Sequence, residues 1–189
     1  MRILVEISAR HVHLSENDFI KLFGKNSNLV PIKKLSQPGE FASSEKISLI
    51  NGKSKIDSVR VLGPLRRNSQ VEISLTDAYK LKLNPLPRIR VSGDLSGTVR
   101  VTAKGPKGNV KIPVIIAQRH LHCTEKQAKE LKLKNNQKIS IKIGKERETT
   151  FHNIVVRASN NYDLSLHLDT DEANAAGIKG KTHGYIVKE

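Results

Sequence analysis

The sequence contains an internal repeat built around two Arg-His-x-His motifs. Residues 7–15 read Ile-Ser-Ala-Arg-His-Val-His-Leu-Ser, and residues 116–124 read Ile-Ala-Gln-Arg-His-Leu-His-Cys-Thr. The two motifs are 109 residues apart, which is more than half of the 189-residue chain. A stretch with helical spacing follows each copy, at 18–23 and at 127–131. A repeat of this length indicates two related modules, each opening with a strand that leads into a short helix.

Short strands are predicted throughout the rest of the sequence. Turn sequences such as Gln37-Pro38-Gly39, Asn51-Gly52 and 105–108 separate the apolar runs, most of which alternate apolar and polar residues. Many short strands with regular turns favour a mainly β fold of barrels or sandwiches over a parallel sheet with long crossover helices. The runs are 46–50, 59–62, 70–75, 88–91, 98–101, 138–143 and 154–156.

Three pairs of residues have the spacing of a helix N-cap and its reciprocal partner. An alanine-rich segment follows the third pair and ends at Gly177, a suitable C-terminal stop. We therefore expect short helices at these points and a structural role for the acidic cluster at 169–172. The pairs are Ser15 with Asp18, Thr124 with Gln127, and Asp169 with Glu172.

Charge and cysteine content narrow the choice of partner and compartment. Lys and Arg number 33 against 18 Asp and Glu, a formal charge of +15, which predicts attraction to polyanions. Aromatic residues are only 4% of the chain, so few stacking platforms for single-stranded nucleic acid are available. The chain has a single cysteine, and no apolar run approaches the about 18 residues that a membrane span needs. The N-terminal residues do not read as a signal peptide. These features predict a cytoplasmic protein.

The two His-x-His motifs are the strongest candidates for chemistry. On a strand, the side chains of His11 and His13 share one face, as do those of His120 and His122. Neutral imidazole binds zinc and the neighbouring first-row metals, and a helix N-terminus just beyond the strand favours a phosphate beside the metal. Four of the seven histidines lie in these pairs. Cys123 alternates to the opposite face, where packing is its expected role.

Other candidates are more ambiguous from the residues alone. Glu72 lies between Val71 and Ile73, where a carboxylate is either solvated, the better-supported alternative, or buried for a purpose. Arg66 or Arg67 could bind phosphate through a bidentate fork, or both could be ordinary surface residues. His167 precedes a predicted helix and is the natural fifth histidine of a site. His152 and His183 lie in looser contexts and are expected to be surface or packing residues.

Several longer motifs resemble one family along nearly the whole chain. The resemblance is to the PduL-type phosphotransacylases, also called phosphate propanoyltransferases. It rests on Ser-Ala-Arg-His-Val-His-Leu at 8–14, Leu-Ser-Gln-Pro-Gly-Glu-Phe at 35–41, Val-Arg-Val-Leu-Gly-Pro-Leu-Arg at 59–66, Gln-Val-Glu-Ile-Ser-Leu-Thr-Asp-Ala at 70–78, Arg-His-Leu-His at 119–122 and His-Leu-Asp-Thr-Asp-Glu-Ala-Asn-Ala at 167–175.

The resemblance implies a fold and a set of site residues. The fold is two β-barrels capped by short helices, with residues 1–9 completing the barrel of residues 118–189 and residues 10–117 forming the other. The resemblance implies a homodimer and two bound zinc ions, or other first-row divalent metals. The residues that the resemblance assigns to metal binding are His11, His13, Glu72, His120, His122 and His167. The resemblance assigns phosphate binding to Arg66, as the catalytic residue. The residues that it assigns to coenzyme A (CoA) are Ser8, Lys33, Arg60, Leu62, His167 and Asn174.

The expected activity is transfer of an acetyl or propanoyl group between CoA and inorganic phosphate at a two-metal site. Two alternatives remain at this point: a metal-dependent thioester or phosphoester hydrolase, and a basic barrel that binds RNA. The sequence begins almost directly on its first predicted strand, without the targeting extension of family members housed in microcompartments. We therefore expect a free cytosolic enzyme that acts on acyl-CoA and phosphate and does not associate with membranes.

Overall fold

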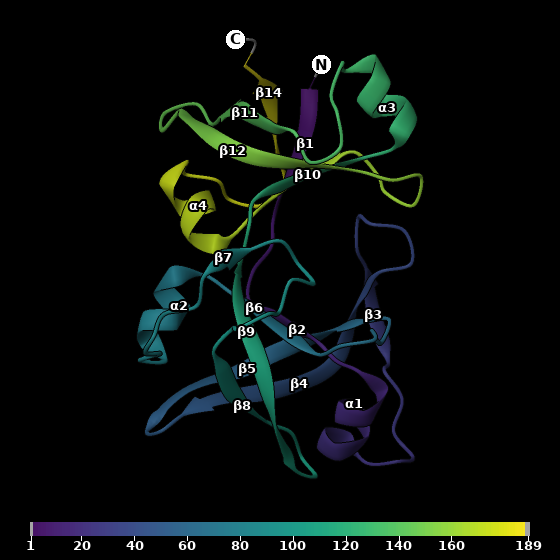
Figure 1. The fold of residues 1–189 in the computed structure, drawn as a ribbon, viewed down its shortest axis with the longest axis vertical. Coiled ribbons are helices and arrows are strands. Elements are labelled where there is room, and N and C mark those ends of the chain that lie inside the picture. The colour runs from purple at the N-terminus through teal and green to yellow at the C-terminus, as the bar shows by residue number, and fades with distance from the viewer. Residues whose placement is uncertain (1, 188–189) are drawn as a thin grey trace. The chain divides into compact units, whose positions relative to one another are not determined.

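The computed structural model describes residues 2–187, which form two compact units. Among these residues, one unit comprises 2–9, 36–38 and 118–187, and the other comprises 10–35 and 39–117. Each unit is a small β-structure with two short helices (Figure 1). Residues 1 and 188–189, which belong to the predicted C-terminal barrel domain, lie outside the described residues.

The first unit is a closed barrel of six strands. Its strand order is β1-β13-β10-β12-β11-β14, and the purple β1 stands among green and yellow strands in Figure 1. β1 pairs in parallel with β13 and antiparallel with β14, so the N-terminal strand closes a barrel otherwise built from the end of the chain. The elements are β1 (Arg2–Ile7), β10 (His120–Cys123), α3 (Glu125–Glu130), β11 (Lys138–Ile143), β12 (Thr149–Ala158), β13 (Ser165–Leu168), α4 (Thr170–Ala175) and β14 (Thr182–Ile186).

The second unit repeats this arrangement. β8 pairs with both β4 and β9, which closes β4-β5-β2-β6-β9-β8 into a six-stranded ring; β3 extends from β4 and β7 from β9. The elements are β2 (His11–His13), α1 (Glu16–Phe23), β3 (Pro31–Lys34), β4 (Phe41–Asn51), β5 (Ser54–Gly63), β6 (Gln70–Ile73), α2 (Leu75–Lys80), β7 (Ile89–Arg90), β8 (Arg100–Lys104) and β9 (Asn109–Ala117).

The sequence repeat is also a repeat of strand pairing. β1 precedes β2 in the chain as β9 precedes β10, and β1 pairs in parallel with β13 as β9 pairs with β6. Each His-x-His strand thus follows a strand that belongs to the other unit. The predicted fold class, a mainly β chain with two barrels related by an internal repeat and capped by short helices, is confirmed.

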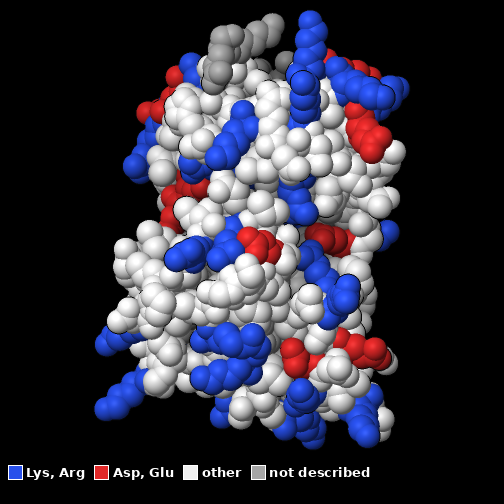
Figure 2. Space-filling model, in the orientation of Figure 1, with Lys and Arg blue, Asp and Glu red and all other residues white. Residues whose placement is uncertain are grey.

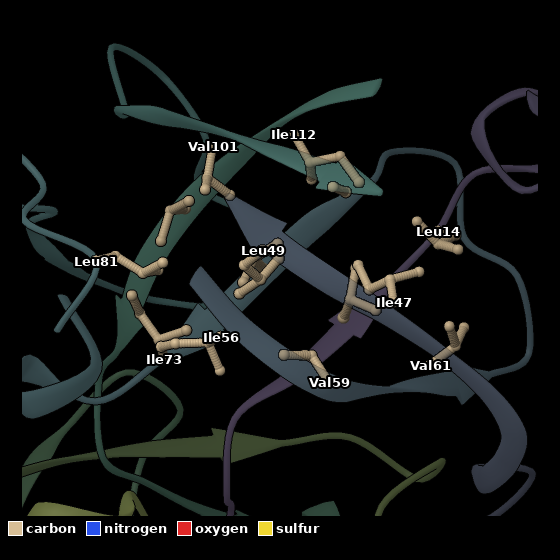
Figure 3. Packing of buried hydrophobic residues seen from close by; sticks show 14 of the residues in the cluster. Leu14, Ile47, Leu49, Ile56, Val59, Val61, Ile73, Leu81, Val101 and Ile112 are labelled. Atoms are coloured by element: carbon tan, nitrogen blue, oxygen red, sulfur yellow. The ribbon is translucent and has the colours of Figure 1, made fainter. Parts of the chain in front are cut away.

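The core of each barrel fixes which way its His-x-His strand faces. Val12 and Leu121, the middle residues of the two motifs, are fully buried in the apolar clusters of their own units. Figure 3 shows the cluster of the second unit, where Leu49 and Ile47 of β4 pack among side chains from β5, β6 and β8. Burying each such side chain contributes roughly 1.5–3 kcal/mol, so the register of β2 and β10 is strongly specified.

The local predictions omitted β3 and most of β9, and they were wrong at the end of one predicted strand. The three predicted N-caps are present, with reciprocal hydrogen bonds at Thr124 and Asp169, and Gly177 has the positive φ of a helix stop. The run 70–75, however, is a strand only as far as Ile73. Ser74 is itself an N-cap that accepts a hydrogen bond from the backbone N–H of Asp77, so helix α2 begins at Leu75.

The surface carries its excess positive charge in a scattered form on the face shown in Figure 2. Lys and Arg side chains there are interspersed with Asp and Glu and do not form one continuous stripe. A groove that follows a nucleic-acid backbone needs such a stripe. Within residues 2–187, none of the helices is both long and apolar enough to cross a membrane.

Gly63 provides a test of the packing that positions the loop before β4. Gly63 and Phe41 are opposite each other on β5 and β4, and a Cβ on Gly63 would overlap the Phe41 ring. We expect Gly63→Ala to lower the free energy of unfolding by about 1–3 kcal/mol through overpacking, measured by urea denaturation. In a Phe41→Ala background the same substitution should cost much less, and an equal cost in both backgrounds would contradict the overlap.

Candidate metal centres

The first candidate centre joins β2 and β6 of the second unit. His11 is directly opposite Glu72 in the antiparallel pairing, and His13 lies two residues further along β2. His11 Nε2 is 3.7 Å from Glu72 Oε2, and His13 Nε2 is 4.0 Å from Glu72 Oε1. One donor atom from each residue lies within 4.8 Å of the others. The register therefore brings Glu72, which is distant in sequence, to the His11 and His13 pair, and the three residues are capable of holding one ion.

The chemistry of these donors fits a divalent metal. His13 is 3% exposed, and its Nδ1 has no hydrogen-bond partner among the described residues. The pKa of His13 is well below its ordinary value, chiefly because burial disfavours the charged imidazole, and also because of the charges of His11 and Arg66. A neutral imidazole is the form that binds metal. Two nitrogens and a carboxylate oxygen are a donor set of catalytic zinc sites, which keep a position for substrate.

Glu72 is buried, so the expectation that it is solvated is wrong. The residue is 6% exposed, and its Oε1 accepts hydrogen bonds from Ser92 Oγ at 2.7 Å and from Gln70 Nε2. Gln70 is held in turn by the backbone N–H of Gly93, which donates to its Oε1 at 2.9 Å. Outer hydrogen bonds of this kind orient a ligating carboxylate. Gln70 precedes Glu72 by two residues on the same strand face, which was a usable signal, whereas nothing in the sequence marked Ser92.

Arg66 lies beside this first centre. The backbone N–H of Arg66 donates to Leu14 O at 2.8 Å, just beyond the end of β2. Its Nη1 donates to Ser92 Oγ at 3.4 Å, and its Nη2 donates to Glu40 Oε1 at 2.8 Å. Arg67 is exposed. The structure thus connects one of the two candidate arginines to Glu72 through Ser92.

The second candidate centre has the same construction in the first unit. His120 is directly opposite His167 in the antiparallel pairing of β10 with β13, as His11 is opposite Glu72. The three imidazole rings of His120, His122 and His167 have centroids 4.5, 5.0 and 5.2 Å apart. Tyr162 stacks on His122 with 4.1 Å between ring centroids. Three neighbouring imidazoles, two of them stacked, offer nitrogen donors of the kind found in zinc sites.

Hydrogen bonds hold two of these imidazoles. The pair His120 Nδ1 and Gln118 O are 2.8 Å apart, and since a carbonyl can only accept, Nδ1 carries the proton. In the neutral ring, Nε2 of His120 is then the unprotonated nitrogen, which can bind a metal. His167 Nε2 is 3.0 Å from Ser165 Oγ, which accepts from Gln37 Nε2 at 2.8 Å. Sequence reasoning missed both Gln37 and Tyr162, because each lies in a loop, where no periodicity predicts which way a side chain points.

Each His-x-His strand is also anchored by the arginine that precedes it. Arg10 Nε donates to Asp77 Oδ2 at 2.9 Å, and Arg119 Nη1 donates to Glu172 Oε1 at 2.7 Å. Asp77 is the third residue of α2, the helix that follows the strand of Glu72. Glu172 is likewise the third residue of α4, which follows the strand of His167. Burial raises the pKa of Glu172. Each ion pair therefore ties the start of a His-x-His strand to the helix beyond its partner strand.

Comparison with known proteins identifies the family. The family model described as phosphate propanoyltransferase matches residues 4–179. The chain is 42% identical to a phosphate propanoyltransferase of Thermotoga maritima over 190 residues, covering 98% of this chain and 89% of the relative. It is 41% identical to one of Alkaliphilus metalliredigens, covering 100% and 89%. The chain belongs to the phosphate propanoyltransferase family. The predicted family, and with it the prediction of an acyltransferase enzyme, are confirmed.

The residues that the family resemblance assigned to CoA divide between the units. Arg60 and Leu62 on β5 are directly opposite His11 and His13, while Lys33 is exposed on β3. In the first unit, Ser8 follows β1 and donates its backbone N–H to Leu168 O at 2.7 Å, His167 belongs to the second centre, and Asn174 is exposed on α4. Cys123 is buried in the core, where burial raises the pKa of its thiol, as suits a packing role.

Metal content measured by elemental analysis tests both candidate centres. Zinc added to metal-free wild-type protein should bind at two ions per chain after removal of excess. His13→Ala should remove one ion and His122→Ala the other, because each substitution leaves only two donors in its cluster. His183→Ala changes an exposed histidine outside both clusters and is the matched control. Two bound ions in either His13→Ala or His122→Ala would contradict the corresponding centre.

Proposed function

We propose that this chain transfers a short acyl group, acetyl or propanoyl, between CoA and inorganic phosphate. The observation that carries the proposal is the buried donor cluster of His11, His13 and Glu72 with the guanidinium of Arg66 beside it. Such an arrangement offers a metal-binding position and a phosphate-binding cation within one unit. The shared name of the family's relatives supports this reading.

Two zinc ions, or other first-row divalent ions, are part of the proposal. His11, His13 and Glu72 would hold one, and His120, His122 and His167 would hold the other. When bound, such an ion polarises a carbonyl oxygen and stabilises a thiolate. The protein's own contribution is to lower the pKa of His13 by burial and to fix Glu72 through Ser92 and Gln70.

The proposed reaction needs no protein nucleophile. Arg66 holds phosphate through its guanidinium fork so that one phosphate oxygen faces the carbonyl carbon of the thioester. That oxygen forms a bond to the carbonyl carbon, and the tetrahedral carbon then releases the CoA sulfur with its electron pair. The products are acyl phosphate and CoA, whose thiolate takes a proton from solvent. Direct transfer is consistent with the buried, packing position of Cys123, the only cysteine.

The proposal assigns CoA to Ser8, Lys33, Arg60, Leu62, His167 and Asn174, following the family resemblance. Lysine and arginine suit the phosphates of CoA, and the chain's +15 charge favours approach of an anionic substrate. Arg60 is already oriented by a hydrogen bond from its Nη1 to the carbonyl oxygen of Ser43. Lys33 is exposed on β3, so its ammonium group can contact a phosphate group of CoA without displacing packed side chains.

We further propose a cytoplasmic homodimer. A single buried cysteine suits a reducing compartment. Exposed apolar residues concentrate between positions 75 and 91 of the second unit, a composition that suits a protein interface. Light scattering at about twice the 21.0 kDa of one chain supports the dimer, and 21.0 kDa excludes it. These residues are Leu75, Tyr79, Leu86, Ile89 and Val91.

Identification of the product tests the activity against the hydrolase alternative. Purified zinc-loaded protein is incubated with propanoyl-CoA and phosphate, and phosphorus nuclear magnetic resonance distinguishes acyl phosphate from inorganic phosphate. We expect acyl phosphate in a one-to-one ratio with released CoA. Release of CoA with free propanoate, at a rate that does not depend on phosphate, would replace the transferase with a thioester hydrolase.

Arg66→Ala should lower kcat/KM for phosphate by about 10²- to 10³-fold, because it removes the cation that binds and orients the attacking group. Arg67→Ala is the matched control, since the neighbouring arginine is exposed, and it should stay within about twofold of wild type. Steady-state rates at varied phosphate concentration make the comparison. Equal effects of the two substitutions would show that Arg66 acts only through the general positive charge.

A further inference from the structure

Arg66 already has a carboxylate partner, Glu40. The Nη2 of Arg66 donates to Glu40 Oε1 at 2.8 Å, and both side chains are about one-third exposed, 34% for Arg66 and 30% for Glu40. The Nη1 of the same guanidinium faces Ser92, which donates to Glu72. One side of the fork therefore points towards the first candidate metal centre, and the other holds an acidic residue that the proposed reaction does not use.

Both partners are fixed in place by their backbones. The Glu40 carbonyl accepts the backbone N–H of Leu35 at 3.0 Å, which closes the loop before β4, and Gly39 has the positive φ that this turn requires. Arg66 is held by the bond from its backbone N–H to Leu14 O. The pair is therefore a built feature of this unit, unlike an ion pair between two long side chains on separate mobile loops.

We propose that Glu40 sets the affinity of the enzyme for phosphate by competing with it for Arg66. This inference rests on the proposed function, because it takes Arg66 as the phosphate-binding residue. A phosphate held by both arms of the guanidinium needs the Nη2 that Glu40 occupies, so one anion must replace the other. When phosphate binds, the carboxylate of Glu40 turns towards solvent, which its partial exposure allows.

Two effects of Glu40 act in the same direction. The ion pair must be broken or shared before phosphate binds, and the remaining negative charge repels the phosphate dianion. Because exposed ion pairs are weak, the penalty should be modest, and we expect removal of the charge to tighten phosphate binding roughly two- to fivefold. A weak intramolecular competitor of this kind lets bound phosphate dissociate readily. It also lowers the affinity of Arg66 for other anions.

Glu40→Gln is the decisive substitution, because the amide oxygen can still accept from Arg66 while the charge is lost. Steady-state kinetics should show a KM for phosphate about two- to fivefold below wild type, with the KM for propanoyl-CoA unchanged. The difference should shrink as ionic strength rises, since salt screens partly exposed charges. Calorimetric titration of zinc-loaded protein with inorganic phosphate makes the same comparison without turnover, with Arg66→Ala binding more weakly than wild type.

Glu16→Gln is the matched control, because it removes the same charge from an exposed position on α1 of the same unit and should not change either KM. A KM for phosphate in Glu40→Gln equal to or above wild type overturns the inference, as does an equal gain in Glu16→Gln. If wild type transfers acyl groups and Arg66→Ala is impaired while Glu40→Gln behaves as wild type, only this inference fails. If wild type makes no acyl phosphate, the proposed function fails, and the calorimetric comparison still decides the role of Glu40.

Discussion

Strand register is the constraint on which both candidate centres depend. Pairing of β2 with β6 places Glu72 opposite His11, and pairing of β10 with β13 places His167 opposite His120. A slip by one residue would turn every side chain of the strand to the other face, exposing Val12 or its counterpart and burying the wrong residues. The apolar core therefore does more than stabilise the barrels. It selects the one register in which three donors from two strands face one another.

The order of strands along the chain extends this dependence to the whole molecule. Within the described residues, β1 closes the barrel that contains β10, and β9 closes the ring that contains β2. Residues 10–117 contain every strand of the second ring together with His11, His13 and Glu72, whereas the barrel that contains β10 is completed only by β1 from the other end of the chain. Each candidate centre consequently relies on a strand pairing between segments that are far apart in sequence, and a substitution in β1 or β9 should affect the centre of the unit that the strand completes.

The repeat, the His-x-His faces and the helix caps could be predicted because they are local patterns of spacing. Glu72 could not be decided from local pattern, since a carboxylate between two apolar residues is compatible with either face until the partner strand is known. Ser92 and Gln37 gave no signal, because loops place them and no periodicity constrains a loop. Helix α2 was missed because a strand-like apolar run ends only one residue before its N-cap, Ser74.

The proposed function requires that the donor clusters bind metal and that this metal takes part in transfer to phosphate. The most direct test removes all metal with a chelator, verifies the removal by elemental analysis, and then titrates zinc back while recording CoA release from propanoyl-CoA with and without phosphate. We expect negligible phosphate-dependent release of CoA from metal-free protein, and recovery in proportion to the metal bound. Metal-free protein that keeps the full phosphate-dependent rate would contradict this requirement.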